Sequence, residues 1–292
     1  KKEKEKNLLI YDAINDLLIK NKILAPKLYK ENYKENFIEI EDFGDDSVFN
    51  LLKKKKSNKI NLYKESIDLL IKIQKIKKNK TKDFKGKNYK IPIYGNSELF
   101  AETKLFSVWY AKKFIPKKKR LKFNIEIKKQ IRFLLSKLKL RNNIFVHRDF
   151  HVSNLMKYKK QLAIIDTQDA LIGNRAYDLA SLIDDVRYKS KKRFKDNIYD
   201  YYLKSNKKFT NEDFLLNDFE ILSVLRNMKI IGIFTRLAVR DKKKKYLKFI
   251  PYTWKLIELR IKNNKIFNEL KKILDFNFSE EVRNIKWKLI LH

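Results

Sequence analysis

The chain of 292 residues combines 43% hydrophobic residues with a formal net charge of +35, and it contains no cysteine. Its apolar content suffices for one large domain or two lobes, and the lack of cysteine excludes a disulfide framework. No apolar run approaches the roughly 18 residues needed to cross a bilayer, and no signal-peptide pattern opens the sequence. We therefore expect a cytoplasmic protein without a membrane partner.

The excess of lysine allows two interpretations. Three basic runs resemble phosphate-contacting patches, which would indicate nucleic acid as a partner; they are residues 53–56, 117–120 and 242–245. Alternatively, abundant Lys, Asn, Ile, Phe and Tyr with scarce Gly and Pro is typical of an A/T-rich genome, in which lysine fills exposed positions everywhere. The runs are dispersed and have no aromatic residues interleaved for stacking, so we favour composition and expect no nucleic-acid partner. The sequence carries no signal for an oligomeric state.

The amino-terminal part predicts a helix followed by a strand. Residues 7–24 carry apolar side chains at helical spacing, and Pro26 is expected to end that helix. Residues 37–40 alternate like a strand, and the acidic segment 41–46 with Gly44 breaks it. The small β region thus precedes a chain that is mostly helical.

The remaining elements follow in the same order. Helical periodicity predicts helices over 62–76, 97–114, 125–140, 177–186, 219–239 and 252–266, with a loop over 79–96. The middle is the exception, with a buried strand at 144–146 and a hairpin formed by 155–158 and 162–165. No internal repeat is present. The pattern predicts an α+β fold with a mainly helical lobe and one small β insert.

That insert carries the motif that indicates chemistry. His147, Arg148 and Asp149 are followed by Asn154, and a short apolar run ends at Asp166. The order and spacing are those of a protein-kinase-type phosphotransferase, in which an H-R-D-x-x-x-x-N loop precedes a metal-binding aspartate. Asp149 is the candidate base that orients and deprotonates a hydroxyl, and Asn154 and Asp166 supply oxygen ligands of the kind that Mg²⁺ prefers.

Two other interpretations of the motif remain open from the residues alone. The segment could be a charged turn between two core strands. His147, Asp149 and His151 could instead hold a zinc or iron ion in a hydrolase. The metal interpretation leaves the spacing of Asn154 unexplained and finds only one further histidine, His292.

Several segments together are similar to the aminoglycoside phosphotransferase/choline kinase superfamily, and in particular to its bacterial branch of sugar kinases acting on the anomeric hydroxyl of N-acetylmuramate and N-acetylglucosamine. The similarity runs over nearly the whole chain. The segments that carry it are 41–45, 102–110, 147–156, 164–170, 177–182 and 226–238.

The resemblance implies a two-lobed, protein-kinase-like α+β fold, ATP and Mg²⁺ as cofactors, and a small-molecule hydroxyl as acceptor. It makes Asp149 the catalytic base, and Asn154 and Asp166 the metal ligands. Backbone groups of Glu41, Asp42 and Phe43 are expected to hydrogen-bond adenine at the hinge. His147 and Asp178 would brace the catalytic loop, although Asp178 could equally be a solvated carboxylate at a helix N-terminus.

The substrate residues are less defined. Glu102 shares a helical face with Phe106 and Trp109, so it is either paired in the core or turned into a cleft that holds sugar hydroxyls. Asp169 could face the same cleft. His151 could contact substrate, but a hydrogen-bonded structural histidine is the interpretation that we favour.

The chain departs from the family pattern at its start. Kinases of this superfamily grip the phosphates with a hairpin loop and a strand lysine that should precede the helix at residue 7, where only residues 1–6 stand. Position 1 is lysine rather than methionine, which favours truncation over a degenerate pseudokinase. We expect residues 1–45 to be a remnant of the N-terminal lobe and hinge, and 46–292 to form the catalytic lobe.

These observations lead to one function and its alternatives. We expect an ATP-dependent kinase for an amino sugar, with weak ATP binding and little turnover for the sequence as it stands. Choline or aminoglycoside phosphorylation is the alternative within the enzyme class, and a pseudokinase that binds RNA or another anionic partner is the alternative outside it. Thr167 also stands where many relatives have an aromatic residue, which would loosen the packing behind Asp166 without removing a ligand.

Overall fold

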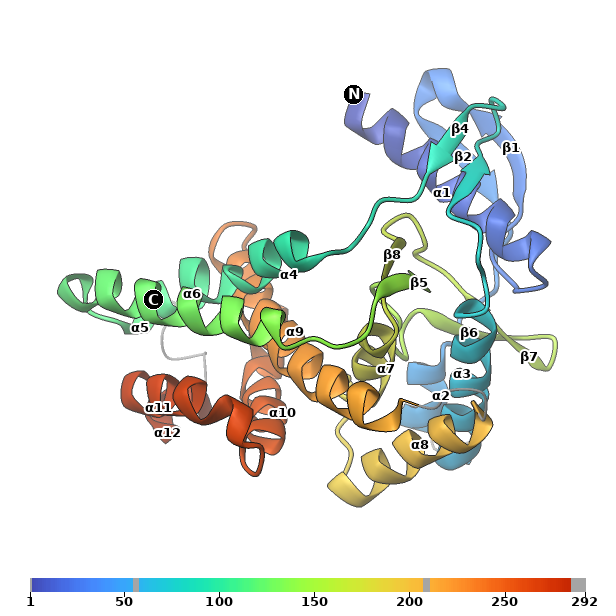
Figure 1. Cartoon of the computed structure of the whole chain (residues 1–292). Coiled ribbons are helices and arrows are strands. Elements are labelled where there is room, and N and C mark those ends of the chain that lie inside the picture. The colour runs from blue at the N-terminus through green and yellow to red at the C-terminus, as the bar shows by residue number, and fades with distance from the viewer. Residues whose placement is uncertain (1, 55–57, 207–210, 285–292) are drawn as a thin grey trace. The chain divides into compact units, whose positions relative to one another are not determined.

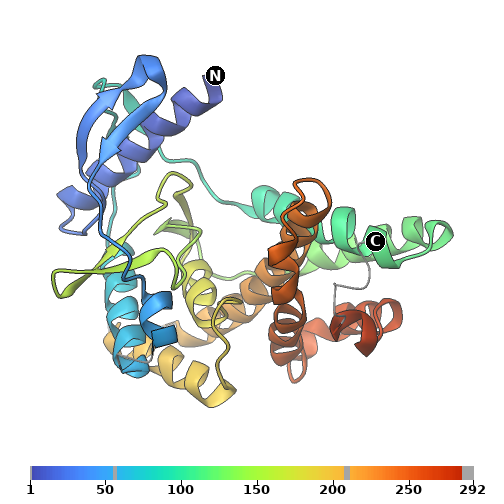
Figure 2. The same ribbon diagram turned by 180° about the vertical axis from the view of Figure 1, so that it is seen from behind.

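The computed structural model describes residues 2–54, 58–206 and 211–284. The chain folds into two compact units, each assembled from two stretches of sequence. The first unit comprises Lys1–Tyr94 and Leu140–Glu212, and the second comprises Gly95–Lys139 and Asp213–His292. Figures 1 and 2 show the elements of both units from opposite sides.

The first unit opens with helix α1 (Lys2–Lys20), as predicted, although it ends earlier than expected. The side chain of Asn21 donates to the Leu17 carbonyl at 2.7 Å, and Lys22 turns the chain at φ 59°. A capped turn therefore stops the helix before Pro26 is reached. The apolar side of α1 is buried, with Ala13, Ile14, Leu17 and Leu18 all in the core.

Two small antiparallel sheets lie in this part of the chain. Strand β1 (Leu28–Asn32) pairs with the predicted β2 (Phe37–Ile40), and β3 (Lys80–Lys82) pairs with β4 (Asn88–Lys90). The loop prediction over 79–96 is thus wrong for β3 and β4. Their polar sequence shows no alternation, and a contact distant in sequence holds them: Thr81 Oγ1 donates to the Ala13 carbonyl of α1 at 3.1 Å.

The central β structure consists of two further antiparallel pairs. Strand β5 (Asn142–Val146) pairs with β8 (Leu171–Asn174), and β6 (Leu155–Tyr158) pairs with β7 (Gln161–Ile164). The predicted β6–β7 hairpin is confirmed, and Lys159 and Lys160 form its turn with φ of 45° and 65°. Positive φ at both central residues matches the right-handed twist of a hairpin, even without Asn or Gly.

Four helices complete the first unit. They are α2 (Val48–Lys54), α3 (Lys59–Ile73), α7 (Ala176–Ile183) and α8 (Lys192–Ser205). The predicted α3 and α7 are confirmed. Gln74 ties three of these segments together, because its amide accepts from Arg175 at 3.0 Å and from the hydroxyl of Tyr202 at 2.6 Å.

The second unit is helical throughout its described residues. Its main helices are α4 (Asn96–Thr103), α5 (Lys112–Phe114), α6 (Arg120–Ser136), α9 (Glu212–Val239), α10 (Ile250–Ile261), α11 (Asn268–Asn277) and α12 (Glu280–Asn284). A π-helical turn (Phe106–Ala111) joins α4 to α5, so the helix predicted over 97–114 is present with an irregular middle. The helices predicted over 125–140, 219–239 and 252–266 are confirmed, with shifted ends.

Close backbone packing fixes the π-helical turn. Gly232 of α9 leaves no room for a side chain, because a Cβ there would lie 2.3 Å from the Leu105 carbonyl carbon. Beside this contact, Trp254 Nε1 donates to the hydroxyl of Tyr110 at 2.9 Å within an aromatic cluster that includes Phe106 and Phe278. Within the described ranges, every helix is too short or too polar to cross a bilayer.

Candidate active site

The H-R-D segment lies between β5 and β6, where the chain makes a compact loop. Arg148 adopts φ 75°, a conformation that non-glycine residues rarely take. The loop closes on itself, because the amide of His151 donates to the Asp149 carbonyl at 3.0 Å and the amide of Asn154 to the His151 carbonyl at 2.9 Å. Asp149 is partly exposed in this loop, and the ring of Phe150 is buried in the core.

A buried carboxylate holds the start of this loop. Asp178 of α7 is 1% exposed, and it accepts the backbone N–H groups of His147 at 2.6 Å and of Arg148 at 3.0 Å. Hydrogen bonds to two amides compensate the desolvation of the carboxylate and hold Arg148 in its unusual conformation. The alternative of a solvated helix N-terminal carboxylate does not apply to Asp178.

The imidazole of His147 connects the loop to the segment before Asp166. The ring is fully buried, and Nε2 lies 3.1 Å from the Ile165 carbonyl, which can only accept, so Nε2 carries the proton. Burial lowers the pKa of His147, while the nearby carboxylates of Asp149 and Asp166 oppose that shift. The histidine is therefore a neutral structural link.

The side chains of Asn154 and Asp166 come together at one end of the β insert, and the backbone of Asp149 joins them. Asn154 is largely buried, and its amide nitrogen donates to the Asp149 carbonyl at 3.1 Å and to Asp166 Oδ2 at 3.4 Å. The amide of Ile165 donates to the Asn154 carbonyl at 3.1 Å, which fixes the spacing between the two segments. Because the amide nitrogen of Asn154 faces the protein, its oxygen is the atom available as a ligand.

Asp166 itself is exposed and held in a left-handed conformation at φ 64°. Its Oδ1 accepts from the side chain of Gln168 at 2.9 Å, and its Oδ2 accepts from Asn154. Strained backbone of this kind is frequent at functional sites, where it aims a side chain. Here it aims a carboxylate from the end of β7 towards the catalytic loop.

Two side chains that the sequence did not single out support these segments. Asp185, 1% exposed, accepts the amide of Val152 at 3.2 Å and the amide of Arg187 at 2.9 Å, so a second buried carboxylate holds the catalytic loop. Asn15 of α1 accepts the hydroxyl of Thr167 at 2.6 Å. No local motif could indicate either residue, because Asp185 and Asn15 contact segments that are distant in the sequence.

Thr167 does not loosen the packing behind Asp166, contrary to expectation. It is fully buried, and Asn15, 3% exposed, continues the connection by donating to the Pro26 carbonyl at 3.1 Å. Thr167 thus stands in place of the expected aromatic residue and connects to α1 through the hydrogen bond of its hydroxyl.

The predicted hinge follows β2. The amide of Glu41 donates to the Lys27 carbonyl at 2.8 Å, and Asp42 Oδ1 accepts the amide of Gly44 at 2.8 Å. Phe43 is buried in an apolar cluster with Met156 and Ala163, which border the β6–β7 hairpin. Leu24, Tyr158 and Ile165 pack against this cluster.

The two candidate substrate residues lie in different surroundings. Asp169 Oδ1 is 3.2 Å from a guanidinium nitrogen of Arg148, and its side chain is about half exposed. Burial, together with the charge of Asp169, raises the pKa of Tyr89. Glu102 belongs to the second unit and forms an ion pair with Lys229 of α9 at 2.8 Å, so the paired interpretation of this carboxylate applies.

The alternative zinc or iron centre finds no support in the described residues. No group of three or more His, Cys, Asp or Glu side chains there is placed to hold a metal ion. His147 is occupied by the Ile165 carbonyl, and His292 lies outside the described residues, as do Lys55 and Lys56 of the first basic run.

Residues 104–213 match the phosphotransferase enzyme family. The matched segment includes the catalytic loop, Asp166 and both bracing carboxylates, Asp178 and Asp185. The family resemblance inferred from the sequence is thereby confirmed.

Curated relatives agree with the family. The chain is 25% identical over 244 residues to an N-acetylmuramate/N-acetylglucosamine kinase of Caulobacter vibrioides, covering 80% of this chain and 65% of the relative. It is 27% identical over 234 residues to the kinase of the same name from Neisseria meningitidis, covering 78% of this chain and 67% of the relative. The chain thus spans about two thirds of the length of these relatives.

Solved structures show the same fold. An ethanolamine kinase from Plasmodium vivax superimposes with a TM-score of 0.55 at 18% identity, covering 89% of this chain and 72% of that one. An ADP-bound aminoglycoside phosphotransferase, APH(2'')-Ib, superimposes with a TM-score of 0.54 at 16% identity, covering 83% and 78%. The predicted kinase-like α+β fold is confirmed, and the family, the relatives and the fold support a small-molecule kinase.

Proposed function

We propose that this protein transfers the γ-phosphoryl group of ATP to a hydroxyl of a small molecule. The observation that carries the proposal is that the side-chain amide of Asn154 donates both to the backbone carbonyl of Asp149, at 3.1 Å, and to the carboxylate of Asp166, at 3.4 Å. Phosphoryl transfer requires a base at the attacking hydroxyl and charge neutralisation at the phosphates, and little other chemistry from the protein. These three side chains would supply both.

Asp149 is the proposed base. Its carboxylate, at the crest of the loop, would accept a hydrogen bond from the acceptor hydroxyl, orient it for in-line attack and take its proton as the bond to phosphorus forms. The two amides bound by Asp178 and the Val152 amide bound by Asp185 hold the loop that carries Asp149. Positioning by such contacts, together with electrostatic stabilisation of the phosphates, is what a protein contributes to this reaction.

The oxygens of Asn154 and Asp166 fit Mg²⁺. One carboxylate and one amide oxygen, with water and phosphate oxygens completing the shell, are the donor set that this small, hard cation prefers. Bound there, Mg²⁺ would neutralise charge on the β- and γ-phosphates. The contacts of Asp166 with Gln168 and Asn154 would keep its carboxylate oriented while the nucleotide binds.

The proposed nucleotide-base site lies at the segment Glu41–Asp42–Phe43. The apolar cluster of Phe43, Met156 and Ala163 would provide a surface against which adenine packs. Backbone groups of the hinge would recognise its edge. In this proposal residues 1–45 contribute small-lobe elements together with the hinge, and residues 46–292 contribute the catalytic lobe.

For the acceptor we propose an amino sugar of the N-acetylmuramate/N-acetylglucosamine type, which rests on the names of the curated relatives. Asp169 is the proposed contact to sugar hydroxyls. The Arg148–Asp169 pair would place an acceptor beside Asp149, because Arg148 adjoins Asp149 in the catalytic loop.

A coupled assay of ADP release tests the function on the full-length gene product. N-acetylmuramate and N-acetylglucosamine are offered beside choline and kanamycin, with MgATP in each reaction. We expect turnover with an amino sugar and a loss of roughly 10²-fold or more in kcat for Asp149→Asn. Choline or kanamycin as the best acceptor would overturn the sugar proposal while retaining the kinase.

The matched control is Asp196→Asn, which changes a partly exposed carboxylate in the same unit that pairs with Lys192 of α8 and lies outside the proposed site. It should keep kcat within a few-fold of the parent. Undiminished turnover by Asp149→Asn would refute the role of the base. Absence of turnover with every acceptor, together with salt-sensitive RNA binding, would favour a pseudokinase.

A further inference from the structure

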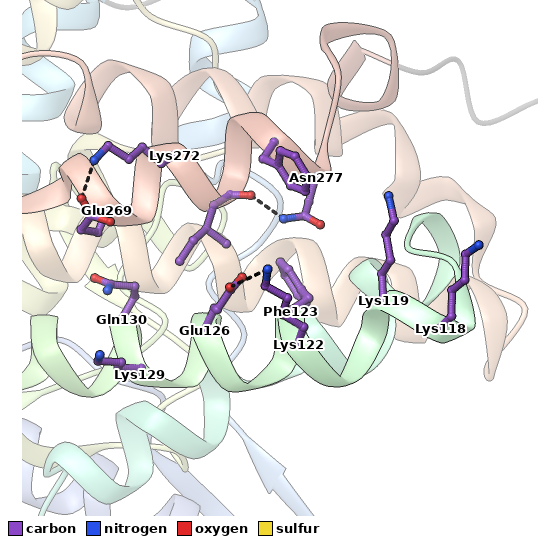
Figure 3. A pocket seen from close by; sticks show the side chains of 12 residues that line it. Lys118, Lys119, Lys122, Phe123, Glu126, Lys129, Gln130, Glu269, Lys272 and Asn277 are labelled. Atoms are coloured by element: carbon purple, nitrogen blue, oxygen red, sulfur yellow. Dashed lines mark hydrogen bonds and ion pairs between the residues drawn. The ribbon is translucent and has the colours of Figure 1, made fainter.

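A basic groove runs between α6 and α11 in the second unit, away from the residues of the catalytic motif in the sequence. Its volume is about 690 Å³, and its walls come from the amino-terminal three quarters of α6, the turn before it, and α11. Figure 3 shows the side chains that line it. The lining residues are Lys118, Lys119, Lys122, Phe123, Glu126, Lys129, Gln130, Glu269, Lys272, Ile273, Phe276 and Asn277.

The groove combines positive charge with an apolar surface. Phe276 is 80% exposed, the most exposed large hydrophobic side chain of the described residues, and the ammonium group of Lys119 lies 6.0 Å from its ring. Phe123 and Ile273 also line the groove. An exposed apolar surface of this kind, rimmed by charge, is typical of a protein interaction site.

Positively charged side chains outnumber negatively charged ones along the groove. Five lysines line the groove against two glutamates. Each glutamate already has a lysine nearby, Glu269 with Lys272 at 2.7 Å and Glu126 with Lys122 at 4.0 Å (Figure 3). Two adjacent hollows around the start of α6 add further basic residues and no carboxylate: Lys104, Lys112, Lys113, Arg120 and Lys128.

The tertiary structure therefore brings together basic and apolar side chains that lie in different parts of the sequence. The basic run at 117–120 contains no aromatic residue, and α11 brings the ring of Phe276 to 6.0 Å from the ammonium group of Lys119. The lysines come from both sides of the groove, so their fields add within it.

We propose that this groove binds an acidic segment of a partner protein, with an aliphatic or aromatic side chain of the segment packed on Phe276. The stretch from Lys118, in the 3₁₀ turn before α6, to Gln130 of α6 offers a length of about 18 Å, which suits a helix of about 12 residues. Acidic side chains of the segment would face Lys118, Lys119 and Lys129, while its apolar side would face the groove floor.

A nucleic acid fits this groove less well. Its backbone carries a negative charge at every nucleotide, and it would meet the carboxylates of Glu126 and Glu269 on both walls. A peptide of mixed composition can place uncharged residues opposite them. The single exposed ring of Phe276 also offers no succession of stacking surfaces for bases.

The experiment measures fluorescence anisotropy with a labelled 12-residue helical peptide that carries Glu on one side and Leu with one Phe on the other. A peptide with Leu and Phe replaced by Ser, a labelled 12-nucleotide oligo(U), and vesicles of neutral lipid with one quarter anionic lipid are the comparison probes. The whole chain is used. The variants are Phe276→Ser and the pair Lys118→Glu with Lys119→Glu.

We expect the amphipathic peptide to bind at least tenfold more tightly than the other probes, and each variant to weaken it at least tenfold. The matched control replaces Lys77 and Lys78 of the first unit by Glu, which changes the net charge equally. Equal binding of oligo(U) or vesicles, equal weakening by the control pair, or no effect of Phe276→Ser would overturn the proposal. Unchanged thermal unfolding of the variants excludes misfolding, since the replaced side chains are exposed.

Discussion

Replacing Thr167 by valine should destabilise the first unit, because it removes the hydroxyl that donates to Asn15 Oδ1 at 2.6 Å. Valine retains nearly the same shape, so packing changes little. Thr167 and Asn15 are 0% and 3% exposed, which leaves no access for a water molecule that could satisfy the amide oxygen. An unsatisfied buried acceptor costs about 1–3 kcal/mol, and we expect a loss of that size.

Tryptophan fluorescence is unsuited to this measurement, since the three tryptophans, at positions 109, 254 and 287, all belong to the second unit. Hydrogen exchange monitored by mass spectrometry resolves the first unit instead. A loss of 1–3 kcal/mol should accelerate exchange of the protected amides in α1 and β7 by about 5- to 150-fold. Amides of α10 should be unaffected.

Two further variants isolate the hydrogen bond. Thr167→Ser keeps the hydroxyl and loses one methyl group, which costs about 1 kcal/mol by transfer alone. A double-mutant cycle with Asn15→Ala then separates the pair from the other contacts of Asn15, and we expect a coupling of about 1 kcal/mol or more. A coupling below about 0.5 kcal/mol would refute the reasoning.

Three other changes have expected outcomes that urea unfolding can check. Burial lowers the pKa of His147, so below about pH 6.5 this histidine binds a proton in the unfolded chain but not in the folded protein. The difference in unfolding free energy between the parent and His147→Asn should therefore shrink as the pH falls below about 6.5, by up to about 1.4 kcal/mol per pH unit. A difference that does not depend on pH would contradict this. Burial, and to a smaller extent the nearby carboxylates, raise the pKa of Asp12 from 3.8 to about 6. Asp12→Asn should therefore stabilise the fold at pH 7 by about 1 kcal/mol, a value reduced by solvent screening of this half-buried group, and the gain should fade between pH 6 and 4. A gain that persists at pH 4 would count against a raised pKa of Asp12. Gly232→Ala should lower the free energy of unfolding by about 1–3 kcal/mol, because its Cβ would lie 2.3 Å from the Leu105 carbonyl carbon. The fluorescence of buried Trp254 should then report unfolding at a lower urea concentration. An unchanged unfolding midpoint would show that α9 can shift to accommodate the methyl group.

The sequence predicted those parts of the fold and of the candidate site that depend on neighbours along the chain. Helix α3 and the β6–β7 hairpin follow from periodicity over a few residues. The catalytic loop has a fixed spacing from Asp149 to Asn154, since both residues belong to one turn closed by its own backbone hydrogen bonds. The choice of Asp149, Asn154 and Asp166 as one group came from that spacing.

Other elements could not be predicted because their stabilising partners lie far away in the sequence. Strands β3 and β4 consist of polar residues, and Ala13 of α1 holds their hairpin. Helix α8 was missed because few of its residues are apolar; it buries Lys195, whose ammonium group donates to the Ile183 carbonyl at 2.6 Å and pairs with Asp184 at 3.0 Å. No local pattern indicates a lysine whose partner lies about ten residues away on another helix.

By itself, the sequence determined which residues could perform phosphoryl transfer, because the motif resides in one contiguous stretch with a fixed internal geometry. Only the tertiary structure decided what holds those residues and what else the surface can bind. The carboxylate of Asp185, the Asn15–Thr167 bond and the approach of Phe276 to Lys119 each join segments distant in the sequence. Such contacts depend on the close packing of whole elements, which periodicity and spacing along a chain do not encode.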